Sequence, residues 1–594
     1  MFLALLFLAS AVILGVSLSN IFFAENKLFY GIVLGVFFSS WVSFVLAFIL
    51  GVSALNVICS SLILLFVAFL LFHNRSFNYH SLFSFKPWLI FVVFLFFTTI
   101  NLLFTFQNSP SGILTILPDT DFHYSVTASF ALGTNFPPVY PFLSAEPLTY
   151  YFLFDFFSAI LAVGGLDLLS AFITYNVLIQ TSLVFLLFSL SKKVVGDSAW
   201  AKLSLFLILF AGSLYFFEAL GPFGPPEQVF YSISTTQRWD SLGYAFFPNA
   251  HQLYSRSFLM GIAISLICFE WLFEGRKPNL FLASLIGLLP LFHASFVPLV
   301  VSFFAFGAVS VLKKEQIEPW AKSMFAVAFL SLPQIIYLTT NKSIPLAFHF
   351  GWTNSDAGIL PGLFNVVKNF AGPLFLFFVG VFAVGSGRRR NLLFCFSLPF
   401  LLGILFEFSP WSFDNIKMFA FWALVSAIFG VLWFRRMWEK NSIWSKALLI
   451  FLLFAITISG FFTTLGFLLI PSPSLISKTE LPVCDFIKTE LPPNAIILTS
   501  GEKSCAYITT GRKVFFAENS ILFTHAVNNL SKRLEENIEM LGGNCYLLKK
   551  YGIDYYYAGG YSPINELKST EKKILEKSVL IFQNQGNKLY KINC

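Results

Sequence analysis

Charged residues are scarce in this chain of 594 residues. Only 11% of them are Asp, Glu, Lys or Arg, whereas an ordinary soluble protein carries about 25%. This shortage excludes a plain soluble enzyme, and the high apolar content excludes intrinsic disorder, which requires the opposite balance. Nucleic-acid binding is not predicted either, because the basic residues occur in pairs and triplets between apolar runs.

Several motifs of common enzymes are missing from the sequence as well. There is no Walker A loop, which leaves ATP-driven transport unsupported. Neither GxSxG nor HExxH occurs, so the common serine-hydrolase and zincin chemistries are not indicated. The seven cysteines form no CxxC pair, which argues against a structural zinc site.

Apolar residues are abundant instead. They make up 57% of the chain, with 79 Phe and a mean hydropathy of +0.76. Lipid is the solvent that accepts so many apolar side chains, and a crossing helix needs about 20 of them in a row. The sequence therefore predicts an α-helical polytopic membrane protein with about fourteen transmembrane helices, at roughly 1–19, 27–50, 52–73, 87–107, 168–190, 200–218, 257–273, 279–292, 294–312, 323–340, 369–386, 391–407, 414–434 and 445–470.

The composition changes after Pro471, where charged residues and turn residues return. We therefore divide the chain into a transmembrane domain (1–470) and a small soluble α/β domain (471–594). Within the second domain we expect a helix near 526–541 and strands at Ala495–Thr499, Lys513–Phe516, Tyr555–Ala558 and Val579–Gln583. Four cysteines in this domain allow three disulfide pairings, provided that the domain faces an oxidising compartment.

Basic residues occur mainly in alternate connecting segments, which predicts that these segments are cytoplasmic. Residues 149–165 look apolar enough to cross, but Asp155 in their centre argues against a crossing, because a buried carboxylate is costly in lipid. We interpret them as an in-plane or re-entrant helix. Residues 108–167 then form one long acidic loop outside a multi-pass cell-membrane protein, and the C-terminal domain is extracytoplasmic as well.

The strongest local signal is the segment LPDTDFHYS, which directly follows a predicted span. Asp119, Asp121 and His123 alternate there, so an extended backbone would place all three on one side. Two carboxylates and an imidazole can act as a general base, or Asp119 and Asp121 can hold a divalent cation such as Mg²⁺ or Mn²⁺. The alternative is that the two acids only cap a helix that begins near Phe122.

Further candidates are expected near the same side of the membrane. Tyr150 and Tyr151 could each stack on a sugar ring or belong to an interfacial aromatic belt. His293 could line the site or be a hydrogen-bonded structural residue. Arg238, Arg256 and Lys417 could bind a lipid phosphate or only contact lipid headgroups. These substrate-binding candidates are Tyr150, Tyr151, Arg238, Arg256, His293 and Lys417.

Three stretches of the sequence resemble the GT-C class of membrane glycosyltransferases, and in particular uncharacterised archaeal polytopic proteins of that class and the Tyr-rich YYY membrane family. They are PDTDFHYSVTASFALGTNFPPVYP with LTYYF, FDNIKMFAFW, and LLKKYGIDYYYAGG. The resemblance implies transfer of a sugar from a polyprenyl-phosphate-linked donor on the outer membrane face, with Asp119 or Asp121 as the base toward the acceptor. No WWDYG-like motif of the oligosaccharyltransferases is present, so a glycan, a lipid and a protein all remain candidate acceptors.

Two other functions stay open at this point. A lipid flippase or transporter would carry ionisable residues near the bilayer midplane and inverted repeats. A non-catalytic membrane scaffold would tolerate substitution of the acidic loop. We take the glycosyltransferase as the prediction, because the acidic residues gather toward one face.

Overall fold

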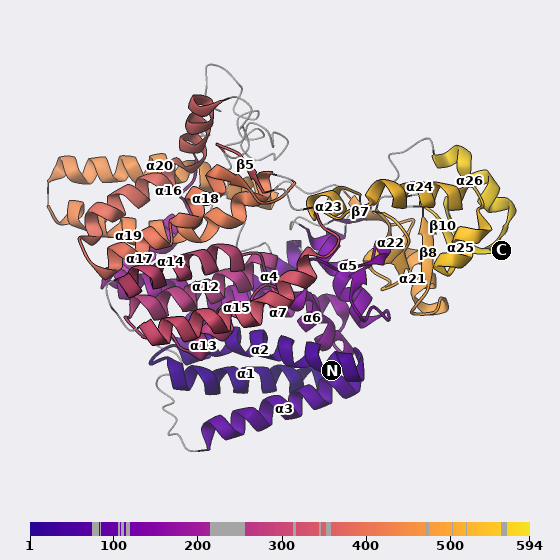
Figure 1. The fold of residues 1–594 in the computed structure, drawn as a ribbon, viewed down its shortest axis with the longest axis horizontal. Coiled ribbons are helices and arrows are strands. Elements are labelled where there is room, and N and C mark those ends of the chain that lie inside the picture. Colours follow the sequence, from indigo (N-terminus) through magenta and orange to yellow (C-terminus); the bar gives the residue numbers. More distant parts are fainter. Residues whose placement is uncertain are drawn as a thin grey trace. The chain divides into compact units, whose positions relative to one another are not determined.

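The computed structural model describes most of the chain, and Figure 1 labels its helices and strands. The chain forms two compact units, which are treated separately below. The first unit comprises 1–181, 338–343 and 472–594, and the second comprises 182–337 and 344–471. The described residues are 1–594 except 74–81, 83–84, 105–106, 109–111, 115–118, 214–255, 313–316, 344–345, 352–357, 411, 441, 470–473, 500, 502, 518 and 560–566.

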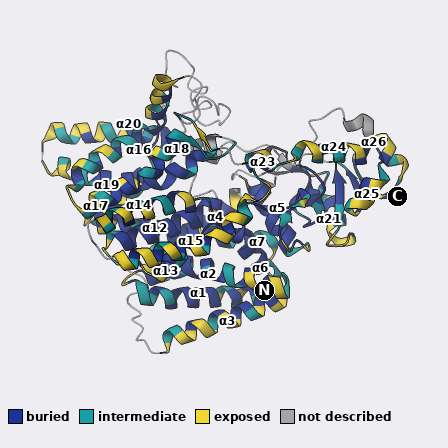
Figure 2. Ribbon diagram, in the orientation of Figure 1, coloured by how far each residue is buried: buried dark blue, intermediate teal, exposed yellow. Residues whose placement is uncertain are grey.

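The first unit begins with a bundle of apolar helices: α1 (Phe2–Phe22), α2 (Lys27–Leu50), α3 (Ala54–Phe72), α4 (Pro87–Phe104) and the first half of α7 (Leu168–Val195). Small residues let α1 and α2 approach closely, since a Cβ added at Gly15 would lie 1.8 Å from the carbonyl oxygen of Gly31. Large apolar side chains such as Phe66 and Leu70 remain exposed along α3 (Figure 2). Lipid tails accept such apolar side chains, whereas their exposure to water would be unfavourable.

Polar side chains join two of these helices inside the bundle. Asn101 on α4 donates a hydrogen bond to the side-chain oxygen of Gln180 on α7 (2.7 Å) and accepts one from Asn176 (2.9 Å). All three side chains are buried. Such amide pairs stabilise helix contacts in an apolar solvent because no water competes for them.

The acidic loop folds into short elements between α4 and α7. These are β1 (Gln107–Asn108), β2 (Gly112–Leu114), α5 (Thr120–Ala131), the hairpin β3 (Val139–Tyr140) and β4 (Leu143–Pro147), and α6 (Leu153–Val163). The 11 residues of α6 span about 17 Å at 1.5 Å per residue, which is too short for a crossing. The expectation that 149–165 does not cross agrees with this length.

The C-terminal part contains a mixed five-stranded sheet. Its order is β11 (Ser578–Asn584), β12 (Asn587–Ile592), β10 (Ile553–Ala558), β8 (Ile496–Thr499) and β9 (Lys513–Val514), and the last three strands run parallel. All four predicted strands are confirmed, as is the predicted helix, and β12 was missed. Two disulfides, Cys484–Cys505 and Cys545–Cys594, select one of the three possible pairings. The elements are β7 (Ser474–Ser477), α21 (Leu481–Glu490), β8 (Ile496–Thr499), α22 (Cys505–Ile508), β9 (Lys513–Val514), α23 (Asn519–Thr524), α24 (Leu530–Leu541), α25 (Cys545–Tyr551), β10 (Ile553–Ala558), α26 (Leu567–Glu576), β11 (Ser578–Asn584) and β12 (Asn587–Ile592).

Backbone contacts join the acidic loop to this C-terminal part. Strand β2 pairs with β7, and the carbonyls of Pro141 and Phe142 accept hydrogen bonds from the backbone N–H groups of Val514 (2.8 Å) and Ala517 (2.9 Å). Helix α5 packs on α22. The predicted boundary between residues 470 and 471 stays a prediction, but the C-terminal part and the acidic loop form one unit.

The second unit is helical and centres on α19 (Ile416–Glu439), most of whose residues are buried. Helix α19 packs on α16, which approaches it closely at Gly380 and Gly430. The other elements are the second half of α7, α8 (Ser198–Phe210), α12 (Arg256–Phe273), α13 (Leu280–Gly287), α14 (Phe296–Leu312), α15 (Ile317–Thr339), β5 (Ala347–Phe348), α16 (Ile359–Val384), α17 (Arg388–Cys395), α18 (Leu398–Leu405), β6 (Phe406–Glu407), η3 (Ser412–Asn415) and α20 (Ile443–Leu469).

In the described part of the chain, 9 helices are long and apolar enough to cross a membrane. The predicted count of about fourteen is not confirmed. The run at 279–292 contains only the 8-residue helix α13, and the run at 391–407 breaks into α17 and α18 of 8 residues each. Periodicity alone does not reveal such breaks, because the broken runs are as apolar as continuous ones.

Candidate functional site

The segment LPDTDFHYS forms the start of a helix in the structure. Asp119 is the N-cap residue of α5 and adopts a left-handed backbone conformation, with φ at 53°. Asp121 and His123 lie within the first turns of α5. The prediction of an extended backbone is therefore wrong, and with it the expectation that alternation places all three side chains on one side. Asp119 makes no side-chain capping hydrogen bond, so capping alone does not describe it.

Asp121 is held by two partners. Its Oδ2 lies 2.7 Å from the ammonium nitrogen of Lys503, and its Oδ1 accepts a hydrogen bond from the backbone N–H of Phe122 (3.0 Å). The Asp121 side chain is 11% exposed and that of Lys503 is 41% exposed. Lys503 comes from the C-terminal part, just before α22, so this ion pair joins the acidic loop to that part.

His123 points instead into the protein. Its Nδ1 lies 2.8 Å from Oδ2 of Asp155 on α6, and both side chains are buried. The rings of Phe122 and Phe154 pack against the imidazole. A buried carboxylate is tolerated where a hydrogen-bonded partner meets it. Asp155, which the sequence presents as an isolated acid in an apolar run, thus has its partner 32 residues earlier.

An aromatic cluster lies beside this pair. Tyr150 and Tyr151 share a hydrogen bond between their hydroxyls. The ring of Tyr150 stacks on His525, with centroids 3.8 Å apart and an interplanar angle of 13°. Tyr140 shares a hydrogen bond with Nδ1 of the same histidine (3.3 Å). The two predicted sugar-stacking tyrosines therefore pack within the protein, and their sugar contact stays a prediction.

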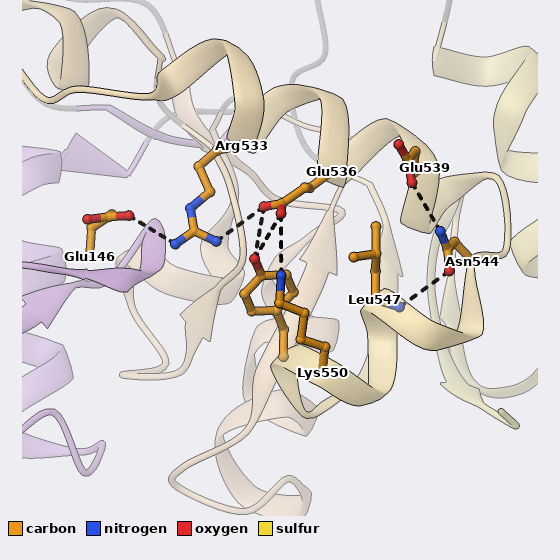
Figure 3. A network of polar contacts seen from close by, with 8 residues as sticks. Glu146, Arg533, Glu536, Glu539, Asn544, Leu547 and Lys550 are labelled. Carbon is orange, nitrogen blue, oxygen red and sulfur yellow. Dashed lines mark hydrogen bonds and ion pairs between the residues drawn. The ribbon is translucent and has the colours of Figure 1, made fainter.

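A charged network follows along the same junction (Figure 3). Glu146 on β4 accepts a hydrogen bond from the guanidinium of Arg533 on α24 (2.9 Å). Arg533 also contacts Glu536 (3.3 Å), whose carboxylate accepts hydrogen bonds of 3.0 Å from the hydroxyl of Tyr551. Asn341, in the segment between α15 and α16, donates to the second oxygen of Glu146 (3.1 Å). Glu146 thus connects three segments that are distant in sequence.

The remaining predicted residues belong to the second unit. His293 is buried, and its Nδ1 lies 2.6 Å from the hydroxyl of Ser295, which agrees with the structural alternative. Arg256 is buried at the start of α12. Lys417 forms an ion pair of 3.1 Å with Asp414, so a cation in the first turn of α19 has a carboxylate beside it. Arg238 lies outside the described residues.

A divalent cation does not fit the described side chains well. Within the described ranges, no three His, Cys, Asp or Glu side chains gather closely enough to hold a metal ion. Asp121 faces the ammonium group of Lys503, and His123 faces Asp155. The proposed ligands Asp119 and Asp121 would supply only part of the oxygen shell that Mg²⁺ or Mn²⁺ requires. The metal therefore stays a prediction, and the chemistry below does not use one.

One further group is electrostatically unusual. Glu480, the residue that precedes α21, is buried, and burial raises the pKa of its carboxyl to about 7, although the hydroxyl of Tyr557 donates a hydrogen bond to it (3.1 Å). The same hydroxyl lies 3.1 Å from the side-chain oxygen of Asn587. This buried acid lies within the C-terminal sheet domain, near the Cys484–Cys505 disulfide.

Sequence reasoning missed Lys503 and His525. Both lie in the C-terminal part, more than 370 residues from the segments they contact. Neither belongs to a motif, and the local sequence carries no signal for such a long-range contact.

These features define a polytopic helical membrane protein in which an acid-bearing loop is joined to a C-terminal α/β part. No protein-family model matches the chain, and no curated protein matches it.

Among solved structures, the chain is similar to the archaeal oligosaccharyltransferase AglB from Archaeoglobus fulgidus in complex with an inhibitory peptide and a dolichol-phosphate, with 12% identity and a TM-score of 0.37. It is also similar to the oligosaccharyltransferase of Archaeoglobus fulgidus in the apo form, with 13% identity and a TM-score of 0.40. Each match covers 85% of this chain and 75% of the other. A likeness this distant assigns no activity to the chain.

Proposed function

We propose that the chain is a GT-C-type membrane glycosyltransferase. It transfers a sugar from a polyprenyl-phosphate-linked donor to an acceptor on the outer face of the cell membrane. One observation carries the proposal: at the junction of the acidic loop with the C-terminal part, Asp121 pairs with Lys503, and Asp119 lies two residues earlier at the N-cap of α5. A carboxylate and a cation at one place are what the transfer requires, since a proton must be removed and a phosphate must leave.

The two disulfides support the outer location of this junction. Disulfides persist in oxidising compartments and are rare in the cytosol. In the proposal the acidic loop and the C-terminal part lie on the same side of the membrane, because strand β2 pairs with β7 and Asp121 forms an ion pair with Lys503. The proposal also keeps the basic connecting segments in the cytoplasm, as their positive charge favours.

Asp119 is the better-placed base of the two acids. It is exposed, whereas Asp121 is buried next to Lys503. In the proposed reaction, Asp119 takes the proton of an acceptor hydroxyl. The acceptor oxygen then bonds to the anomeric carbon of the sugar, the bond from that carbon to the phosphate oxygen breaks, and the polyprenyl phosphate departs with the electron pair. In the proposed reaction Lys503 supplies the positive charge that meets the departing phosphate, and its ion pair with Asp121 holds the first turn of α5 in place before the transfer.

The test is the transfer of radiolabelled sugar from a polyprenyl-phosphate-linked donor in membranes that contain the protein. General base catalysis contributes about 10²–10⁴-fold, so Asp119→Asn should lower the rate by that factor while the protein accumulates normally. Asp121→Asn should lower it less. Asp167→Asn is the matched control, because Asp167 is an acid of the same loop that caps α7 through Ser170 (2.9 Å).

Full transfer by Asp119→Asn would end the mechanism as stated, and full transfer by Asp121→Asn as well would remove the acidic loop from the reaction. A scaffold protein predicts that result, since its acidic loop tolerates substitution. A flippase predicts movement of the lipid-linked sugar across the bilayer without any sugar reaching an acceptor.

A further inference from the structure

His525 lies where the acidic loop meets the C-terminal part, directly after α23. Its imidazole is 9% exposed and contacts three rings of the loop. It stacks on Tyr150 (3.8 Å), meets the edge of Phe122 (5.0 Å, interplanar angle 72°) and shares a hydrogen bond with the hydroxyl of Tyr140 (3.3 Å). Contacts this numerous hold a side chain in one orientation.

Two of these rings connect directly to the proposed site. Phe122 follows Asp121 in the chain, and its backbone N–H donates to the Asp121 carboxylate (3.0 Å). Tyr150 packs against Phe122 (5.2 Å) and lies 6.3 Å from the ring of His123. A displacement of His525 would therefore be passed to the first turn of α5 through rings that touch one another.

We infer that His525 is a positioning residue for the proposed transfer reaction: its imidazole fixes Phe122 and Tyr150, and through them the carboxylates at the start of α5. This inference rests on the proposed function. The role assigned to His525 rests on its contacts with these rings, through which it acts on the start of α5.

The experiment compares three variants of the full chain in membranes: His525→Leu, His525→Phe and Arg533→Gln. Leu keeps the apolar volume but removes the aromatic plane and Nδ1, while Phe restores the plane. Arg533→Gln breaks the contact between Arg533 and Glu146. This contact also joins the C-terminal part to the acidic loop, but on β4 and not on α5. Two quantities are measured: kcat and KM for the lipid-linked donor, and hydrogen exchange of the α5 amides.

His525→Leu should lower kcat by up to about 10²-fold, the scale expected when catalytic groups shift by about 1 Å, with little change in KM. Its α5 amides should exchange faster. His525→Phe should recover most of kcat and of the α5 protection. Arg533→Gln should speed exchange near β4 and leave kcat close to that of the wild type.

Wild-type kcat and wild-type α5 exchange in His525→Leu would overturn the inference. So would an equal fall of kcat in Arg533→Gln, because the loss would then come from loosening the whole junction. If the wild-type protein transfers no sugar, the proposed function fails, while the exchange of the α5 amides still decides whether His525 positions that helix.

Discussion

The acidic side chains of the loop face different surroundings, and these surroundings decide what each can do. Asp155 is buried against His123, and removing one member of such a pair costs about 3–5 kcal/mol because the other is left without compensation. Asp121 pairs with a partly exposed lysine, and such pairs contribute about 0–1 kcal/mol. Asp155 is therefore a structural acid, whereas the acids at the start of α5 can change with little effect on stability.

Glu480 leads to a pH prediction for the stability of the C-terminal part. Burial raises the pKa of its carboxyl from 4.5 to about 7, so the folded protein keeps a proton that the unfolded chain releases. The free energy of unfolding of the C-terminal part then falls by at most about 3 kcal/mol as the pH rises from about 4.5 to about 7. Above about pH 7 this contribution no longer changes. Glu480→Gln should remove this fall and slow hydrogen exchange of β10 at pH 8.

The control for this experiment is Glu490→Gln, which changes an exposed acid at the end of the same helix, α21. It should leave the pH dependence of β10 exchange as in the wild type. If Glu480→Gln exchanges like the wild type at both pH 5 and pH 8, the buried carboxyl does not hold its proton as described.

At the scale of elements, helix α5 is positioned at both of its ends. Its start contacts Lys503, and its far end meets the turn at Gly511, whose φ is 76°. A Cβ added at Gly133 would lie 2.2 Å from the carbonyl oxygen of Gly511. Because this neighbour is a backbone atom, it cannot move aside as a flexible side chain would. The two glycines therefore let the loop and the C-terminal part approach more closely than larger residues allow.

Gly133→Ala should separate these two backbones. Overpacking of this kind typically costs about 1–3 kcal/mol, so limited proteolysis should cut the acidic loop faster than in the wild type. Thr134→Ala, at the exposed neighbouring residue, serves as the control and should be cut at the wild-type rate. Equal protection of Gly133→Ala would show that the close approach is not required.

At the scale of the whole molecule, the chain combines membrane helices with a disulfide-bonded part that requires an oxidising compartment. This combination predicts how the cysteines react with a large maleimide reagent after denaturation of protein made in its native membrane. Without reduction, only Cys59, Cys268 and Cys395 should react. After reduction, all seven should react. Seven reactive thiols without reduction would place the C-terminal part in a reducing compartment and remove the support for an outer site.

The sequence alone predicted the membrane class, most of the apolar helices and four of the five strands of the C-terminal sheet. The physical reason is that apolar runs, β-rich segments and composition changes are local properties of the chain. It also singled out Asp119, Asp121 and His123, because they alternate directly after a predicted span, although the extended backbone assumed for them was wrong.

Only the tertiary structure decided which partner each of these residues meets. His123 pairs with Asp155, Asp121 with Lys503 and Tyr150 with His525, and two of these contacts join residues more than 370 positions apart. Local sequence patterns do not record such pairings, since they arise from how the loop packs on the C-terminal part. The breaks that leave α13, α17 and α18 with 8 residues each likewise appear only in the folded chain.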